Sequence, residues 1–322
     1  MGSVHSSIIQ PLRKKGSLRR KKNESKSRET FSSSPCVPWL TDPEFERRAN
    51  DAGDILNYIL RRPIVSSPAP TSRNILLISA NGGTTLPQLL RMFPDAQITY
   101  YDMFPVPEDS TRCIPSDDAA RVIYAKFNLY HDILPLSSET YDLIVLRQIN
   151  RILPDHRWVP LLWEARRLCR PGGWIEATGV NDFVCGAGPN NQRLFRVFRK
   201  IVEERQINFR FIDTLGTSFA SANLPQPTHT KHQCPIGPWG GIVGRMVLSL
   251  AKGYLELTAS TLESSGQKDQ ADEIMELLGP WEEEINEMEG YCVVHSWVTR
   301  LPESQEEGKK CRESNEKMRL DV

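Results

Sequence analysis

Apolar and polar positions follow two different periods in the middle of the chain, and together they predict a sheet covered by helices. Short apolar runs at residues 74–80, 96–101, 121–127, 143–146 and 174–178 have the length and composition of buried strands. Segments between these runs carry apolar residues at spacings of three and four, as amphipathic helices do. Strands that alternate with helices predict a doubly wound α/β fold with a mostly parallel sheet and right-handed crossovers.

The clearest copy of this pattern lies between residues 141 and 176. A Tyr-Asp pair leads into the apolar run at 143–146, and a polar break follows at 147–150. Apolar residues then recur at helical spacing up to Leu168, and Arg-Pro-Gly-Gly at 170–173 ends that helix. The block therefore predicts a strand, a helix and the next strand of a parallel sheet.

Further helices and one late strand are predicted outside this block. Asp42, Pro43 and Glu44 have the order of a helix start, and the apolar spacing continues until just before Pro63. Between residues 208 and 239 the pattern is weak. The remaining predicted elements are helices at 86–92, 192–205, 242–262 and 269–287, and a strand at 291–299 that we expect to lie antiparallel at the sheet edge.

Charge divides the chain into three parts, although Lys+Arg and Asp+Glu are balanced at 40 each. Residues 1–38 are rich in Ser, Lys and Arg and poor in large apolar side chains, so we expect a disordered basic tail. Residues 39–301 contain the predicted elements and form one expected domain. Residues 302–322 are a charged C-terminal tail.

Three interpretations of the basic tail remain open. It is a solvated tail, a nuclear-localisation or polyanion-binding segment, or a peripheral membrane anchor. Gly2 and Ser6 match the N-myristoylation pattern, and a basic patch is a suitable second anchoring signal. We expect a cytoplasmic or nuclear protein without a transmembrane segment, and no nucleic-acid partner apart from this tail.

The cysteines and histidines do not predict a metal site. The seven cysteines are scattered without a Cys-x-x-Cys pair, and no secretory signal is visible, so we expect free thiols in a reducing compartment. Cys185, His229, His232 and Cys234 do not have an established ligand spacing. A short-chain dehydrogenase is also excluded, because no tyrosine is followed by Lys four residues later.

The block at residues 141–176 resembles the second half of class I S-adenosylmethionine (SAM) methyltransferases. In that family an acidic residue leads a strand, and a Lys/Arg-Pro-Gly-Gly turn precedes the next. Residues 39–300 resemble, more narrowly, fungal LaeA-like methyltransferases, through residues 40–48 and the Pro-x-Gly-x-Trp segment at 235–239. The resemblance implies a mostly parallel seven-stranded sheet with helical lid insertions, SAM as cofactor, and a small-molecule substrate from secondary metabolism.

The family's glycine-rich cofactor loop is only partly kept. The resemblance places Ser79, Asn81 and Gly83 on the three glycines of Gly-x-Gly-x-Gly, with Ala80 between the first two, and Leu77 on the preceding acid. Ser is small and Asn tolerates positive φ, so the loop could still close around SAM. Loss of the acid should weaken contacts to the amino-acid end of the cofactor.

The other strand ends provide further candidate contacts. Asp102, followed by Met103, ends the second strand, where a carboxylate can accept both ribose hydroxyls. The resemblance places Asn128 at the adenine-facing position, and Arg147 in the cleft, near either substrate or the cofactor carboxylate. No residue is assigned as a catalytic base.

The substrate region and the activity itself leave alternatives. Phe183, Phe211, Phe219 and Trp239 suggest an apolar or aromatic substrate wall, or else they are ordinary core. An active methyltransferase is the favoured function. The alternatives are a regulatory protein on the same fold with a protein partner, and a methyltransferase fold used for chemistry without SAM.

Overall fold

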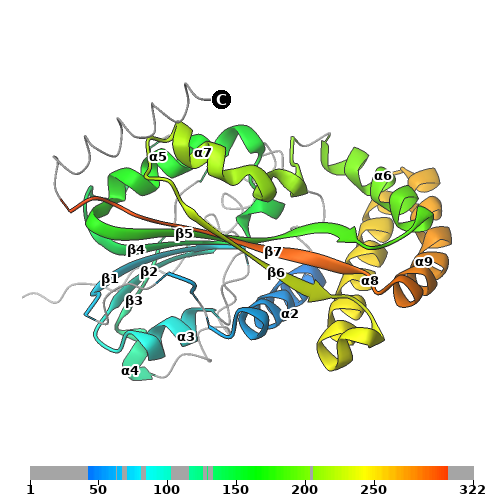
Figure 1. Ribbon diagram of the computed structural model, residues 1–322, viewed down its shortest axis with the longest axis horizontal. Helices are drawn as coiled ribbons and strands as arrows, with labels where there is room; N and C mark the ends of the chain where they lie inside the picture. Colours follow the sequence, from blue (N-terminus) through cyan, green and yellow to red (C-terminus); the bar gives the residue numbers. More distant parts are fainter. Residues whose placement is uncertain are drawn as a thin grey trace, which may run out of the picture. The chain divides into compact units, whose positions relative to one another are not determined.

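A computed structural model describes residues 43–62, 64–66, 71–80, 85–102, 116–125, 129, 133–203 and 206–303. They build one seven-stranded sheet in the order β3-β2-β1-β4-β5-β7-β6 (Figure 1). The first five strands are parallel, while β7 runs antiparallel to both β5 and β6, so the doubly wound α/β prediction is confirmed. The strands are β1 (Asn74–Ser79), β2 (Gln97–Asp102), β3 (Val122–Tyr124), β4 (Tyr141–Arg147), β5 (Cys169–Cys185), β6 (Thr228–Pro235) and β7 (Tyr291–Arg300).

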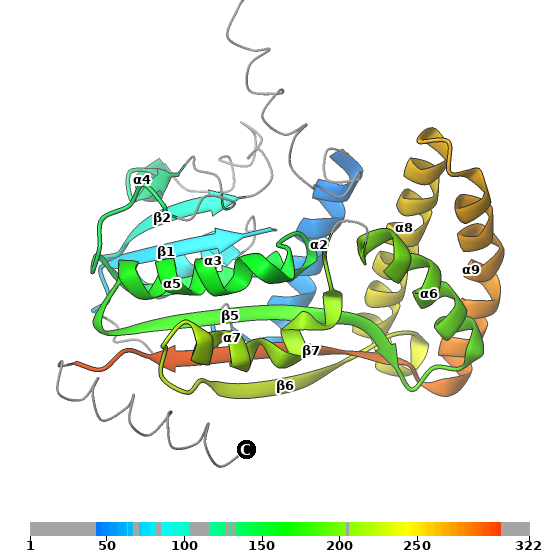
Figure 2. The ribbon, with the colours of Figure 1, turned by 90° about the horizontal axis from the view of Figure 1, so that it is seen from above.

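Helices cover both faces of the sheet and gather beyond one end of it. Figure 1 shows α2, α3 and α4 on one face and α5 and α7 on the other. Figure 2 shows α6, α8 and α9 grouped beyond the ends of the parallel strands, where they form the expected helical insertion. The helices are α2 (Pro43–Leu60), α3 (Thr85–Met92), α4 (Ser116–Ala119), α5 (Trp158–Leu168), α6 (Pro189–Glu203), α7 (Leu215–Ser221), α8 (Gly241–Ser264) and α9 (Lys268–Met288).

Strands β1 and β4 form the centre of the core because both of their faces are buried. Alternate side chains point to opposite sides of a strand. In β1, Ile75 and Leu77 join the cluster beneath α3, whereas Leu76 and Ile78 join the larger cluster beneath α5. This double burial explains why the sequence shows continuous apolar runs and not an alternation.

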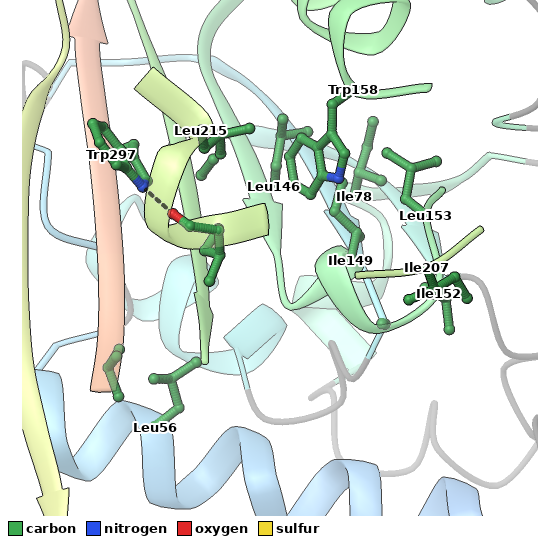
Figure 3. Packing of buried hydrophobic residues seen from close by; sticks show 14 of the residues in the cluster. Leu56, Ile78, Leu146, Ile149, Ile152, Leu153, Trp158, Ile207, Leu215 and Trp297 are labelled. Atoms are coloured by element: carbon green, nitrogen blue, oxygen red, sulfur yellow. Dashed lines mark hydrogen bonds between the residues drawn. The ribbon is translucent and has the colours of Figure 1, made fainter. Parts of the chain in front are cut away.

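Trp158, the first residue of α5, fills the space between the helix and the larger cluster. Its side chain is 1% exposed, and Figure 3 shows it beside Ile78, Leu146 and Ile149. The ring also stacks on Phe211, with centroids 6.1 Å apart. Since large aromatic side chains bury 150–250 Å² each, this residue is a major contact between α5 and the sheet.

Two strand predictions were wrong at the sheet's antiparallel side. The edge strand is β6 and not β7, which lies between β5 and β6. The segment Thr228–Pro235 was missed because its residues are polar and mostly exposed, as an edge strand permits. Strand β5 is also longer than expected, because residues 179–185 pair with β7, far along the chain.

Smaller differences concern turns and ends. The Arg-Pro-Gly-Gly stretch lies inside β5, where Gly172 (φ 73°) accompanies a register shift against β4. Strand β3 is shorter than predicted. The helix-capping Asp42, residues 1–38 and almost all of 302–322 lie outside the described residues. Within the described part of the chain, no helix has the length and apolar character needed to cross a bilayer.

We expect Trp158→Ala to lower the free energy of unfolding by about 3–5 kcal/mol, because it leaves a large cavity beneath α5. Urea unfolding followed by circular dichroism measures this change. The control is Trp163→Ala on the same helix, where the side chain is 48% exposed and a loss below about 1 kcal/mol is expected. Equal losses in the two variants would contradict this account of the core.

Candidate functional site

The carboxyl ends of four neighbouring parallel strands lie level with one another. Ser79 of β1 pairs with Asp102 of β2 on one side and with Arg147 of β4 on the other, and Arg147 pairs with Thr178 of β5. Neighbouring strands are about 4.8 Å apart, so the fold brings three of the predicted cofactor residues into one row. This edge of an open α/β sheet is where ligands bind.

The first strand stays bonded to β4 one residue beyond this row. Ser79 is fully buried, and the Ala80 N–H donates to the Arg147 carbonyl oxygen at 3.1 Å. The backbone therefore leaves β1 still attached to β4. Of the other predicted contacts, Asn81, Gly83, Met103 and Asn128 lie outside the described residues.

Arg147 lies inside the protein and bonds to a helix. The residue is 0% exposed, and Nη2 donates to Asn57 Oδ1 of α2 at 2.6 Å. Within the part of the chain that the structure describes, Nε and Nη1 have no hydrogen-bond partner. Burial lowers the pKa of Arg147 to about 10, although the nearby Glu176 carboxylate opposes this shift. The side chain thus remains charged at neutral pH and joins the end of β4 to α2.

A second buried charge, Glu176 of β5, holds the segment that follows α2. Its carboxylate accepts the N–H of Val65 at 3.0 and 2.8 Å and the N–H of Ser66 at 2.7 Å. The Thr178 hydroxyl donates to it at 3.2 Å. Charge-assisted bonds of this kind are the strong ones, so α2 and its exit are fixed across the sheet edge.

An apolar chamber lies between α2, the inserted helices and the extended ends of β5, β6 and β7. Its volume is about 160 Å³, more than ten times the space that one water molecule needs. The turn that follows β4 meets this chamber at Gln148 and Arg151. The apolar lining includes Leu56, Val184, Phe198, Leu250 and Trp281.

Three of the aromatic residues suggested by the sequence, Phe211, Phe219 and Trp239, are not among the residues that line this chamber. Phe219 is completely buried core, and Phe211 packs on Trp158, so the ordinary-core alternative holds for both. Trp239 is 41% exposed and donates its indole N–H to the carbonyl oxygens of Ile236, just after β6, and Gly290, just before β7. The side chain of Phe183 lies outside the described part of the structure.

The aromatic lining comes instead from the inserted helices. It consists of Phe195 and Phe198 on α6, Tyr254 on α8 and Trp281 on α9. The three-residue spacing of the two phenylalanines was visible in the sequence, but it is equally typical of a helix that packs on a core. Only the tertiary structure shows that this face borders a cavity.

His229 lies on the opposite face of β6 from His232 and Cys234, so the three side chains do not converge. His229 stacks on Trp297 at 3.5 Å, and its Nε2 lies 3.0 Å from His295 Nδ1. His295 Nε2 in turn lies 3.0 Å from Asp213 Oδ1. In the part of the chain that the structure describes, no group of three or more His, Cys, Asp or Glu side chains is placed to hold a metal ion.

Comparisons with known proteins give fold neighbours only. No protein-family model and no curated protein sequence match this chain. Two solved structures of Haemonchus contortus phosphoethanolamine N-methyltransferase 2 are similar to it, with 15% identity each and TM-scores of 0.45 and 0.48. They match 78% and 83% of this chain, which spans only 57% and 60% of theirs.

A third similar structure is geranyl diphosphate C-methyltransferase from Streptomyces coelicolor A3(2). It has 13% identity and a TM-score of 0.41, and the match covers 76% of each chain. Likeness at this level concerns the arrangement of the chain and does not assign an activity.

The stacked histidines predict a pH dependence of stability. Burial lowers the pKa of His295 to about 4, and burial together with His295 lowers that of His229 to about 4, whereas an unfolded histidine titrates near 6.5. Between these values the unfolded chain binds more protons, so we expect stability to fall as pH drops from about 6.5 to about 4. Urea unfolding at a series of pH values measures the free energy of unfolding, and His229→Gln should make this free energy depend less steeply on pH. An equally steep dependence in His229→Gln would contradict the assignment of this pH effect to the histidine pair.

Proposed function

We propose that this protein is a SAM-dependent methyltransferase that acts on a small and largely apolar molecule. The observation that carries the proposal is the row of strand ends at Asp102, Ser79 and Arg147, which lies next to an apolar chamber. A polar sheet edge suits a nucleoside cofactor, and a dry chamber beside it suits the acceptor. SAM supplies an activated methyl group, so the protein needs mainly to bind, orient and exclude water.

On this proposal, each strand end contacts a different part of SAM. We assign the ribose hydroxyls to Asp102, and the amino-acid part of SAM to the backbone from Ser79 and Ala80 through Asn81 and Gly83. Met103 and Asn128 are assigned to the adenine. These roles follow the sequence resemblance and the order of the strands.

Arg147 suits the carboxylate of the cofactor. Two of its buried nitrogen atoms have no hydrogen-bond partner in the described segments, and a guanidinium forms strong bidentate hydrogen bonds with a carboxylate. In the described conformation the third nitrogen is committed to Asn57. We therefore expect Arg147 to bind the cofactor while it stays attached to α2.

The narrower type is a LaeA-like enzyme of fungal secondary metabolism. Its support is the sequence resemblance at residues 40–48 and 235–239, in addition to the apolar chamber. The catalytic domain spans residues 39–301 on this proposal. The basic tail at 1–38 and the charged tail at 302–322 flank it, and the tail with Gly2 directs the protein to the nucleus, the cytoplasm or a membrane surface.

Isothermal titration of SAM against the purified protein tests the proposal. We expect binding in the micromolar range, and we expect Asp102→Ala to weaken it at least tenfold, because two hydrogen bonds to a charged acceptor are lost. The matched control is Asp95→Ala, an exposed carboxylate that precedes β2 at the opposite end of the strand. This control should bind SAM like the unaltered protein.

Absence of binding at millimolar SAM would overturn the proposal. It would favour one of the alternatives, a regulatory protein with a protein partner or a fold that works without SAM. If Asp102→Ala and Asp95→Ala weaken SAM binding equally, SAM remains the cofactor, but the assignment of the ribose hydroxyls to Asp102 is wrong.

A further inference from the structure

We infer that the side-chain amide of Gln148 is the polar anchor of the chamber, where it donates a hydrogen bond to an uncharged acceptor oxygen, such as a ketone or ester carbonyl, of an otherwise apolar ligand. This deepens the proposed function, since the ligand of the chamber is then the methyl acceptor. The sequence resemblance places Arg147 and Gln148 at the cleft, but it assigns no ligand contact to Gln148. Four observations carry the inference: the backbone, the amide, the competing polar groups and the charge of the wall.

The backbone at Gln148 is held in a costly conformation. Its φ of 55° and ψ of 22° place it in the left-handed region, which is uncommon for any residue except glycine, asparagine and aspartate. The residue joins the end of β4 to the 3₁₀ turn Ile149–Arg151, and its N–H donates to the Thr178 carbonyl oxygen at 2.7 Å. Strain of this kind persists only where the surroundings enforce it, and it gathers at functional sites.

The neighbours of Gln148 enforce this conformation from both sides. Arg147 before it is buried and bonded to Asn57. After it, Asn150 Nδ2 donates to the Val180 carbonyl oxygen of β5 at 3.0 Å. The position of Gln148 is therefore fixed by bonds of its neighbours to α2 and β5.

The amide of Gln148 is buried with a donor unused. The residue is 1% exposed and lines the chamber, and its Nε2 has no hydrogen-bond partner among the described residues. A buried N–H without an acceptor is costly, and most such groups in native proteins are bonded. An acceptor oxygen on a ligand would satisfy it.

Two other polar side chains of the wall, Asn191 and Thr258, form hydrogen bonds with the protein. Asn191 accepts the Trp281 indole N–H at 3.1 Å and donates to the Val184 carbonyl oxygen at 3.2 Å. The Thr258 hydroxyl donates to the Tyr254 carbonyl oxygen at 2.7 Å. The unused donor of Gln148 is thus distinguished from these groups, whose bonds hold the wall itself together.

The charge of the wall decides which acceptor fits. Arg151 lies over the Tyr254 ring, 5.3 Å from its centroid, and the rest of the lining is apolar or neutral. A cation would meet no counter-charge among the described lining residues, and an anion would have to draw Arg151 away from the Tyr254 ring, whereas a carbonyl needs one donor. The chamber should therefore prefer a neutral molecule with one oxygen near β4.

Two probes that differ by one oxygen test this inference by isothermal titration in the absence of SAM. They are 1-indanone, which carries a ketone, and indane, which has the same rings without it. We expect 1-indanone to bind about three- to tenfold more tightly than indane, the range that one neutral hydrogen bond supplies. In Gln148→Leu this preference should disappear, with indane affinity unchanged.

Two further variants make the test specific. Gln192→Leu makes the same substitution on the exposed side of α6 and should keep the full preference for 1-indanone. Gln148→Gly removes the amide but tolerates positive φ, so it should fold even if the leucine variant does not, and it should also lose the preference. Circular dichroism verifies folding of each.

The inference is overturned if Gln148→Gly or Gln148→Leu retains the preference for 1-indanone. It is also overturned if neither probe binds the unaltered protein at millimolar concentration, or if both bind equally well. These titrations contain no cofactor, so they test the chamber separately from SAM binding. If the protein does not bind SAM but still prefers 1-indanone, the methyltransferase proposal is wrong and the role of Gln148 stands.

Discussion

Two buried charges at the end of the parallel sheet determine where helix α2 lies, and the candidate site depends on α2. Arg147 bonds the helix through Asn57, and Glu176 accepts backbone N–H groups of the segment that leaves it. Helix α2 then supplies a wall of the apolar chamber through Ala52, Ile55, Leu56 and Ile59. Without these bonds, the polar row of strand ends would have no closed space beside it.

Charges buried in this way are not a general source of stability, since desolvation offsets much of the gain. Their value here is geometric. Arg147 and Glu176 lie on neighbouring strands and point to the face that carries α2, so a shift of register by one residue would turn both to the face of α5. The buried charges therefore fix register and helix position together, and removing one partner would leave the other charge uncompensated.

The centre of the fold could be predicted from the sequence because its strands and helices are marked by the apolar pattern of their own residues. Strands β1 and β4 are apolar on both faces, and α8 and α9 carry a clear helical period, so these elements were found within a few residues. Strand β6 was missed, since an exposed edge strand needs no apolar alternation. The far half of β5 was missed as well, because its pairing with β7 comes from over a hundred residues away.

The site was less predictable than the fold for the same reason. The row at Asp102, Ser79 and Arg147 follows from strand ends, which a pattern can locate. The chamber takes its walls from α2, α6, α8, α9 and three strands, and each of these faces looks like ordinary core when taken alone. The backbone of Gln148 left no signal, because glutamine has no preference for positive φ that a pattern could reveal.

The structure gives a physical reason for an apolar residue at position 77, where the sequence resemblance places the acid of the methyltransferase loop. Leu77 is fully buried in the cluster beneath α3, with Leu89 and Val145. A carboxylate there would be desolvated without a partner, so leucine stabilises the sheet where an acid would weaken it. If SAM binds, its ammonium group must find acceptors elsewhere in this chain, while its carboxylate finds the buried cation of Arg147. The cofactor would then be held more by its nucleoside and carboxylate than by its ammonium group, and this is why the effect of Asp102→Ala should be large.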